Sequence, residues 1–388
     1  DGKPTAAALR EKLISMGYPE NITPEKGTVP SAISAVDRNF KLPQVWKTSF
    51  AVDYQVPVSF PMSVSVEGIF NKTLNAATLT DWSVQDAKGF PRFNGADNRP
   101  VYPKGSSVGT SAYVLENTSR GYGWSFSAQV NAQPWEWLNL MAAYTHTVSK
   151  EVTSLPGSNA SSVLNYISTV YGPNNIKLHN GQNVTPDRII ASATIHDKCN
   201  NHYSFIYEAW RGGYNYSYMM VNDINADGYN YDAIYIPTDQ QVADNEFRFK
   251  SEDDKTRFMD YVHANSYLKN HQGEYAEAYS LYNPWVHRID FSYKHDFKFD
   301  VAGHTNTIQL SFDMKNVLNF FNSSWGVMKY LNPEIGSDPR ILRYEGNDKD
   351  GYATFSTPKS INGNTKTFVP NHSIGQCWYA SVGLRYIF

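Results

Sequence analysis

The sequence predicts an all-β fold, and within that class an antiparallel transmembrane β-barrel of which this chain supplies about nine strands. Three observations predict it: runs in which apolar and polar residues alternate, a regular succession of short and long connections, and 14% aromatic residues against only 18% charged residues. Mean hydropathy is −0.49, and no apolar run approaches the roughly 20 residues of a membrane-spanning helix. A barrel strand remains compatible with this hydropathy, because every second residue is polar.

The alternation is clearest at 308–315, where Ile308, Leu310, Phe312 and Met314 are interleaved with polar residues. The same period of two recurs near 49–56, 63–70, 288–297 and 378–388. With their flanking residues these runs extend for 12 or more residues. That is longer than the about 5–6 residues typical of soluble strands and enough for the about 9–11 that a transmembrane strand needs. We therefore expect one face of the sheet to be apolar and the other polar.

The connections alternate strictly in length. Short ones lie at 57–61, 133–137, 199–202 and 300–303, and long ones lie near 76–108, 152–186, 220–284 and 320–375. Outer-membrane barrels alternate tight periplasmic turns with long external loops in this way. Loops longer than about 12–15 residues are uncommon in compact domains, so four of them on one side indicate function at that side.

These connections define the predicted strands. Inward strands are expected near 46–57, 109–132, 187–198, 285–299 and 376–388, and outward strands near 62–84, 137–151, 202–219 and 304–319. Residues 119–121 are predicted as a bulge within one strand, because a turn there would break the alternation. Single-chain bacterial barrels have even strand numbers, so an odd number near nine predicts that further strands come from elsewhere. Residues 1–45 are expected to form an external segment with a short helix, and 46–388 the C-terminal part of the barrel.

Several blocks of the sequence resemble Oar-like TonB-dependent outer-membrane receptors of Bacteroidota-type bacteria. They include DRNFKLPQVWKTSFAVDY from Asp37, NTSRGYGWSFSAQ from Asn117, NDINADGYNYDAIYIP from Asn222, FDMKNVLNFFNSSWGV from Phe312 and the terminal WYASVGLRYIF. The blocks follow the family order and cover most of the chain from residue 37 onward. The alternation that ends in Tyr386 and Phe388 also resembles the signal by which barrels are recognised for membrane insertion.

The resemblance implies the C-terminal portion of a roughly 22-stranded barrel in the bacterial outer membrane. It implies a non-enzymatic role in energised uptake of a nutrient such as a peptide, glycan or chelate. The implied partners are the remaining barrel strands and plug domain, the TonB energy-coupling complex, the barrel insertion machinery and outer-membrane lipid. Unlike family members, this sequence shows no signal peptide, carboxypeptidase-regulatory-like domain, plug or TonB box, so we expect a fragment or one polypeptide of a divided barrel.

A calcium site is predicted in the third long loop. Asp223, Asn225, Asp227 and Asp232 follow the pattern D-x-N-x-D-G-x-x-x-D, and the carbonyl of Tyr229 would add a further oxygen. Oxygen ligands at alternate positions suit a hard cation, and the glycine permits the sharp turn. The twelfth position is Ile234 rather than the glutamate of an EF-hand, so an Asx-rich external turn is the alternative.

A cluster of tyrosines in the same region is a candidate substrate vestibule, comprising Tyr214, Tyr216, Tyr218 and Tyr231. Such rings stack on sugars or peptides, but they also form the aromatic girdle of a barrel wall. Ser251 and Asp254 form a capping box that predicts a surface helix near 252–264.

The sequence excludes some function classes and leaves others open. A net charge of −3 with both signs dispersed provides no basic field for nucleic acid. Neither G-x-S-x-G nor H-E-x-x-H is present, so no enzymatic site is predicted. The leading hypothesis is part of a transporter; an outer-membrane adhesin and a secreted carbohydrate-binding β protein are the alternatives.

Overall fold

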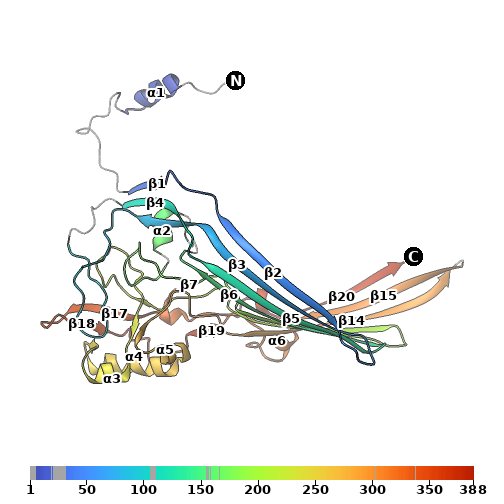
Figure 1. Ribbon diagram of the computed structural model, residues 1–388. Helices are drawn as coiled ribbons and strands as arrows, with labels where there is room; N and C mark the ends of the chain where they lie inside the picture. The colour runs from blue at the N-terminus through green and yellow to red at the C-terminus, as the bar shows by residue number, and fades with distance from the viewer. Residues whose placement is uncertain are drawn as a thin grey trace.

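A long, curved sheet carries a body of folded loops at one end (Figure 1), and its strands are antiparallel except for β1, which pairs parallel with β4. The computed structural model describes residues 6–18, 20, 32–104, 111–153, 157, 159–165, 167–301, 303–336 and 338–388. The long strands are β2 (Gln44–Gln55), β3 (Met62–Asp81), β4 (Ser111–Thr118), β5 (Tyr122–Trp135), β6 (Leu138–Glu151), β8 (Asp187–His196), β9 (Asn201–Arg211), β14 (Val286–Val301), β15 (His304–Lys315) and β20 (Tyr379–Ile387). Two short strands join them, β1 (Ala32–Val36) beside β4 and β7 (His179–Asn180) beside β6.

In the described part of the chain the sheet contains ten long strands, two of which continue one another. It has 12 strands, and removing the two short ones and counting β4 with β5 as one leaves 12 − 2 − 1 = 9. The order β2-β3-β5-β6-β8-β9-β14-β15-β20 follows the chain, as successive antiparallel hairpins require. The described part of the chain is therefore mostly β, as predicted.

β4 and β5 continue one another along the same edge of β3. Lys72 pairs with Tyr122 and Ala76 with Thr118, so the register is unchanged across the gap between them. Both β4 and β5 run antiparallel to β3, which confirms the predicted absence of a turn. The predicted bulge is wrong, because neither strand carries an extra residue. Gly121, at φ +140°, interrupts the ladder instead.

The two faces of the sheet differ as the alternation predicts. One cross-strand row on the first face is apolar throughout, namely Tyr54, Val64, Val130, Ala142, Ala191, Tyr207 and Ile289. A row on the opposite face is polar, namely Asn139, Thr194, Ser204, Ser292, Asp313 and Ser381. On this polar face Ser292 Oγ donates to Asp313 Oδ1 at 2.6 Å, and Lys315 pairs with Asp290 at 2.8 Å. Side-chain hydrogen bonds thus join strands on the polar face, while in the apolar row the Tyr207 hydroxyl reaches His287 Nδ1 of β14 at 2.8 Å.

The sheet is open at both edges within the described residues. β2 pairs only with β3, and β20 pairs only with β15. Every residue of β2 is exposed, and in β20 all except Gly383 are. A closed barrel, which the sequence predicts for the complete assembly, is not formed by these strands alone. Both edges offer unpaired backbone groups to a further strand.

Short and long connections alternate between the long strands in the described part of the chain. Short turns lie at 56–61, 136–137, 197–200 and 302–303, and long loops lie at 82–110, 152–186, 212–285 and 316–378. The long loops contain α2 (Ala160–Leu164), β10 (Met219–Met220), β11 (Tyr235–Ile236), α3 (Asp239–Ala243), β12 (Arg248–Phe249), α4 (Glu252–Ala264), α5 (Ser266–Asn270), β13 (Glu274–Tyr275), α6 (Val317–Phe321), β16 (Lys329–Leu331), η1 (Pro333–Ile335), β17 (Arg340–Asn347), β18 (Ala353–Ser356), β19 (Phe368–Pro370) and η2 (Ile374–Gln376).

Two helices lie in the intervals where the sequence predicts a helix. α1 (Ala6–Ser15) lies in the N-terminal segment, whose residues 1–5, 19 and 21–31 fall outside the described part. α4 occupies the predicted interval, and Ser251 Oγ accepts the backbone N–H of Asp254 at 3.1 Å. Of the described helices, none has the length and apolar character needed to span a lipid bilayer.

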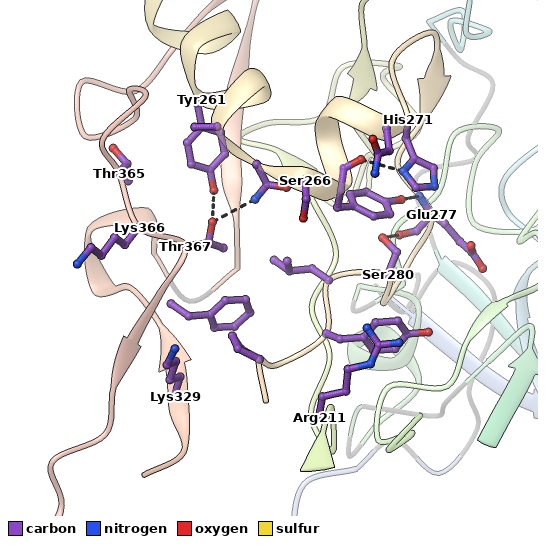
Figure 2. A pocket seen from close by; sticks show the side chains of 18 of the residues that line it. Arg211, Tyr261, Ser266, His271, Glu277, Ser280, Lys329, Thr365, Lys366 and Thr367 are labelled. Atoms are coloured by element: carbon purple, nitrogen blue, oxygen red, sulfur yellow. Dashed lines mark hydrogen bonds between the residues drawn. The ribbon is translucent and has the colours of Figure 1, made fainter. Parts of the chain in front are cut away.

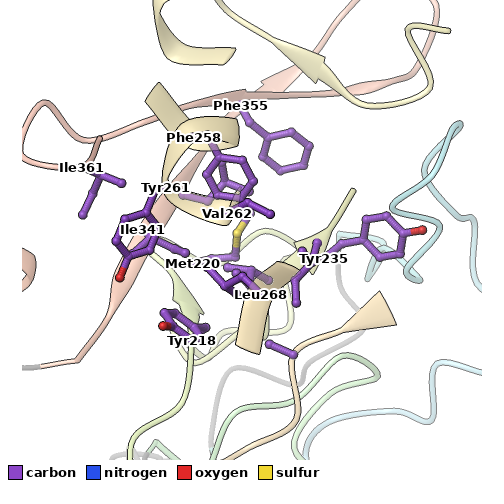
Figure 3. Packing of buried hydrophobic residues seen from close by; sticks show 14 of the residues in the cluster. Tyr218, Met220, Tyr235, Phe258, Tyr261, Val262, Leu268, Ile341, Phe355 and Ile361 are labelled. Atoms are coloured by element: carbon purple, nitrogen blue, oxygen red, sulfur yellow. The ribbon is translucent and has the colours of Figure 1, made fainter. Parts of the chain in front are cut away.

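The largest hydrophobic cluster of the described residues lies in the loop body (Figure 3), and a smaller one includes Leu79 of β3 and Tyr113 of β4 at the end of the sheet. Phe258 and Val262, one turn apart on α4, are both fully buried, and Ile341 of β17 and Phe355 of β18 pack in the same cluster. The third and fourth long loops therefore share one core. The loops form a folded unit above the strands, which holds the candidate site.

Candidate functional site

The predicted calcium ligands lie together in one turn of the third long loop. Asp223 Oδ2 accepts the N–H of Gly228 at 2.9 Å, and Asn225 Oδ1 accepts that of Asp227 at 3.0 Å. Asp227 Oδ1 in turn accepts the N–H of Tyr229 at 2.8 Å. Ala226 and Gly228 both adopt positive φ, +61° and +93°, which bends the backbone back over the side chains. The Asx-rich turn is thus formed as the alternative interpretation predicted.

An arginine from the first long loop closes this turn from the other side. Arg99 is completely buried and binds both carboxylate oxygens of Asp97 at 2.9 Å. Its Nη1 lies 3.3 Å from Asp232 Oδ1, and its Nη2 donates to the carbonyl of Ala233 at 2.7 Å. The bidentate contact with Asp97 lies within the first long loop, whereas the contacts with Asp232 and Ala233 link this buried arginine to the third long loop.

The carboxylates of the turn are crowded. Burial and the nearby Asp223 raise the pKa of Asp227 to about 7. Burial also raises the pKa of Asp223, whose Oδ1 is enclosed without a hydrogen-bond partner. Carboxylate oxygens such as these are the ligands that a hard cation prefers. As placed, however, no three His, Cys, Asp or Glu side chains of the described residues are arranged to hold a metal ion.

The side chain of Tyr229 is fixed by a hydrogen bond. Its hydroxyl donates to Asp81 Oδ2 at 2.6 Å, at the end of β3. The other oxygen of Asp81 accepts the N–H groups of Ser83 and Ala112, both at 2.9 Å. The turn is therefore anchored to the rim of the sheet, through residues that the sequence analysis did not single out.

The four vestibule tyrosines do not form one surface. Tyr218 is fully buried in the loop core, and its hydroxyl accepts the amide of Asn265 at 2.7 Å. Its ring therefore serves the core instead of a ligand-facing surface, which corrects the prediction for this residue. Tyr214 is 47% exposed and contacts Tyr216 at 5.1 Å between ring centroids. The Arg340 guanidinium lies over the ring of Tyr231, 5.0 Å from its centroid.

A cavity of about 940 Å³ lies above the ends of β6 and β9 (Figure 2). Lys150 and Arg211 come from the ends of these strands, Glu277 from the third long loop, and Lys329 and Lys366 from the fourth. Tyrosine and histidine side chains complete the lining, namely Tyr261, Tyr267, His271 and Tyr282. The sequence analysis missed this cavity, because its lining comes from segments far apart in the chain.

A polar cluster lies directly below this cavity. Asp187 Oδ1 accepts the hydroxyl of Tyr144 at 2.6 Å and lies 2.8 Å from His146 Nδ1. Its other oxygen accepts Arg211 Nε at 2.5 Å. By strand alternation all four residues lie on the apolar face of the sheet. The apolar face therefore ends in charged and polar groups just where the loops begin.

The C-terminal residues predicted as an insertion signal are accessible. Tyr386 is 54% exposed and Phe388 95% exposed, and their rings lie 5.8 Å apart between centroids. The Tyr386 hydroxyl donates to Asn306 Oδ1 on β15. Their placement on a free edge strand leaves both rings available to another protein, while the signal itself stays a prediction.

The described strands form a large mixed sheet with one apolar face. Comparison with solved structures finds a likeness to an outer-membrane protein. The chain is similar to the crystal structure of the outer membrane transporter YddB from Escherichia coli, with a TM-score of 0.40 and 12% sequence identity. The likeness covers 92% of this chain but 34% of that one, so the chain spans about a third of its length. No family model and no curated protein matches the sequence. The resemblance to Oar-like receptors accordingly stays a prediction.

Proposed function

We propose that this chain forms part of the wall and external vestibule of an outer-membrane TonB-dependent transporter. One observation carries the proposal: nine long antiparallel strands form a sheet with one apolar and one polar face, with all long loops folded at one end. A soluble protein would leave the apolar face in water, whereas a bilayer covers it. The polar face would line the lumen.

The two free edges support a divided barrel. β2 and β20 expose apolar side chains on one face and unpaired backbone along their outer sides. Backbone groups without partners are costly in lipid, so both edges require further strands. We propose that these strands and the plug domain come from the remainder of the assembly, which also engages the TonB complex for energised uptake of a peptide, glycan or chelate.

Membrane fractionation tests the location. The chain should stay with outer membranes through washes in high salt and in alkaline buffer, and should be released only by detergent. Release into buffer would favour the secreted carbohydrate-binding alternative and reject the barrel.

Uptake measurements test the transport role. Nutrients whose uptake is lost when the chain is deleted should also fail to enter a strain that lacks the energising complex. Attachment defects without uptake defects would favour an adhesin.

We also propose that calcium binds the Asp223–Asp232 turn. The enclosed Oδ1 of Asp223 and the raised pKa of Asp227 support it, because negative charge there is poorly offset. A bound cation would supply the missing charge and order the third long loop. Calcium titration calorimetry should give binding near the 10⁻⁴–10⁻³ M level, about that of other extracellular modules. Asp227→Asn should abolish the heat and the exposed control Asp260→Asn should retain it; no heat from the parent protein would reject the site.

A further inference from the structure

We propose that the cavity above β6 and β9 binds the phosphate-bearing headgroup of a lipid in the outer leaflet, with lysine and arginine side chains as its anion ligands. The inference rests on the proposed function, because it requires the apolar face of the sheet to lie in lipid. It goes beyond that function by assigning a specific lipid site to named residues.

The height of the cavity on the wall matches the headgroup layer. β9 runs from the turn at Asn201 to Arg211. Ten steps of ~3.3 Å give about 33 Å along the strand, and a tilt of about 40° reduces this to about 25 Å along the barrel axis. The apolar band of an outer-membrane barrel is also about 25 Å tall. Arg211 is therefore at the level where hydrocarbon gives way to headgroups.

The floor of the cavity belongs to the lipid-facing side of the wall. Arg211 follows Tyr207 and Ala209 at alternate positions of β9, and Tyr207 belongs to the apolar row. Lys150 follows Ala142 and Tyr144 in the same way on β6, with the β5 register unbroken throughout. A lumen substrate would meet the opposite face. The two basic side chains thus lie at the loop end of the face that the proposed function turns toward lipid.

The charges of the cavity favour an anion. Four basic residues and one acidic residue line it, which gives 4 − 1 = +3 in a chain whose net charge is −3. Lys150 pairs with Glu277, and Arg211 with Asp187. Lys329 and Lys366 pair with no carboxylate in the described part of the chain. Figure 2 shows Lys329 beside the cavity and Lys366 at its rim, with the Lys366 amine extending outward. These two amines are available to a phosphate.

The remaining lining suits the sugar of a glycolipid headgroup. The Tyr282 ring lies under the Arg211 guanidinium at 5.3 Å, and Tyr267 is stacked on His271 at 4.2 Å. Aromatic faces pack against sugar rings, and polar groups beside them fix the orientation. A volume of about 940 Å³ is at the upper end of ordinary ligand sites and accommodates a phosphorylated disaccharide. We therefore assign the ligand to the phosphorylated glycolipids.

The test uses the complete assembly purified from outer membranes, stripped of lipid and reconstituted in phosphatidylcholine nanodiscs. Binding of bisphosphorylated lipid A and of its dephosphorylated form is measured by native mass spectrometry. The double variant Lys329→Gln/Lys366→Gln should bind the phosphorylated lipid about thirtyfold more weakly, the loss expected for two lysines near anionic headgroups. The matched control Lys349→Gln/Lys359→Gln removes two exposed charges of the same loop outside the cavity and should bind as the parent does.

Three results would overturn the assignment: equal binding by the cavity variant, equal binding of the dephosphorylated lipid, or displacement of the lipid by inorganic pyrophosphate at comparable concentration. The last result would assign the cavity to a soluble anion. The comparison of the two lipids needs no variant, so it decides even if a substitution perturbs folding. A chain that leaves the membrane in alkaline washes contradicts the proposed function instead, which distinguishes the two failures.

Discussion

Arg99 is the residue on which the connection between the first and third long loops most depends. It is fully buried, and its removal would leave Asp97 and Asp232 without their cation. Arg99→Ala should destabilise the loop body by about 3–5 kcal/mol, since breaking a buried pair leaves uncompensated charge. This loss of stability is measured by heating the protein and monitoring unfolding through limited proteolysis within residues 212–285. Exposed Arg343→Ala should stay within about 0.5 kcal/mol of the parent, and equal effects of the two variants would refute the role given to Arg99.

Because of the buried His179, we expect the stability of the loop body to depend on pH. The His179 Nδ1 donates to the carbonyl of Asn180 at 2.8 Å, and its Nε2 is buried without a partner. Burial lowers the pKa of His179 below its usual value, so the unfolded chain binds a proton more readily than the folded one. Stability should therefore be complete above about pH 6.5 and fall as acid is added below it.

The measurement for His179 is the melting temperature across the range from neutral to mildly acidic pH. His179→Gln should flatten the acid slope, because the titrating group is gone. The exposed His372→Gln should leave the slope unchanged. A parent protein whose melting temperature rises on acidification through this range would show that the sign is wrong.

For single residues, the sequence predicts sites whose members are close along the chain, but it does not predict sites whose members are distant in the chain. The Asp223–Asp232 turn was found because its spacing is local and regular. Arg99 was not, since it is 133 residues away from Asp232 and lies in a loop without periodicity. The cavity lysines were missed for the same reason: ordinary surface lysines have no pattern that marks a shared site.

Helix α4 is the element whose boundary the sequence defined best. The Ser251 hydroxyl accepts the N–H of Asp254, and Ser251 Oγ also donates to Asp254 Oδ2 at 2.6 Å. Ser251→Ala should destabilise the loop body by about 1 kcal/mol, because an N-terminal amide loses its acceptor. Ser251→Asp keeps an acceptor and should restore most of it. Urea unfolding curves compare the variants, and equal losses for alanine and aspartate would exclude a capping role.

The two faces of β8 provide a direct test of which side meets lipid. Ala191 lies in the apolar row, and its neighbour Ser192 points to the opposite face. Ala191→Arg should cost about 2–4 kcal/mol near the middle of the bilayer and reduce the amount of folded protein in the membrane. Ser192→Arg faces the lumen and should be tolerated. The yield of heat-resistant folded protein on cold gels separates them, and the reverse order would invert the assignment of faces.

Long strands were predictable because a period of two over many residues is characteristic of a strand with two unlike faces. The short strands of the loops were not. β10, β11, β12 and β13 have two residues each, too few to show any period, and they form only because the loops share a core. The break between β4 and β5 shows the same limit. Sequence located it correctly at 119–121 but did not distinguish a bulge from an interruption in register.

The whole molecule consists of a long sheet with a body of folded loops at one end. Its largest hydrophobic cluster lies in the loops, its long strands carry an apolar face on which Phe205, Leu310 and Leu384 are exposed, and its two edge strands are unpaired on their outer sides. Each feature is unfavourable for an isolated protein in water and is relieved by a bilayer and by additional strands. The central claim is therefore that the sheet is one segment of a larger closed barrel.

A density map of the assembly extracted from outer membranes in detergent tests that claim most directly. The account predicts further strands hydrogen-bonded along both β2 and β20, a closed wall with the apolar face inside the detergent belt, and the four long loops on one side. A map showing this chain alone, with either edge unpaired or with its apolar face packed on a soluble domain outside the belt, would contradict it.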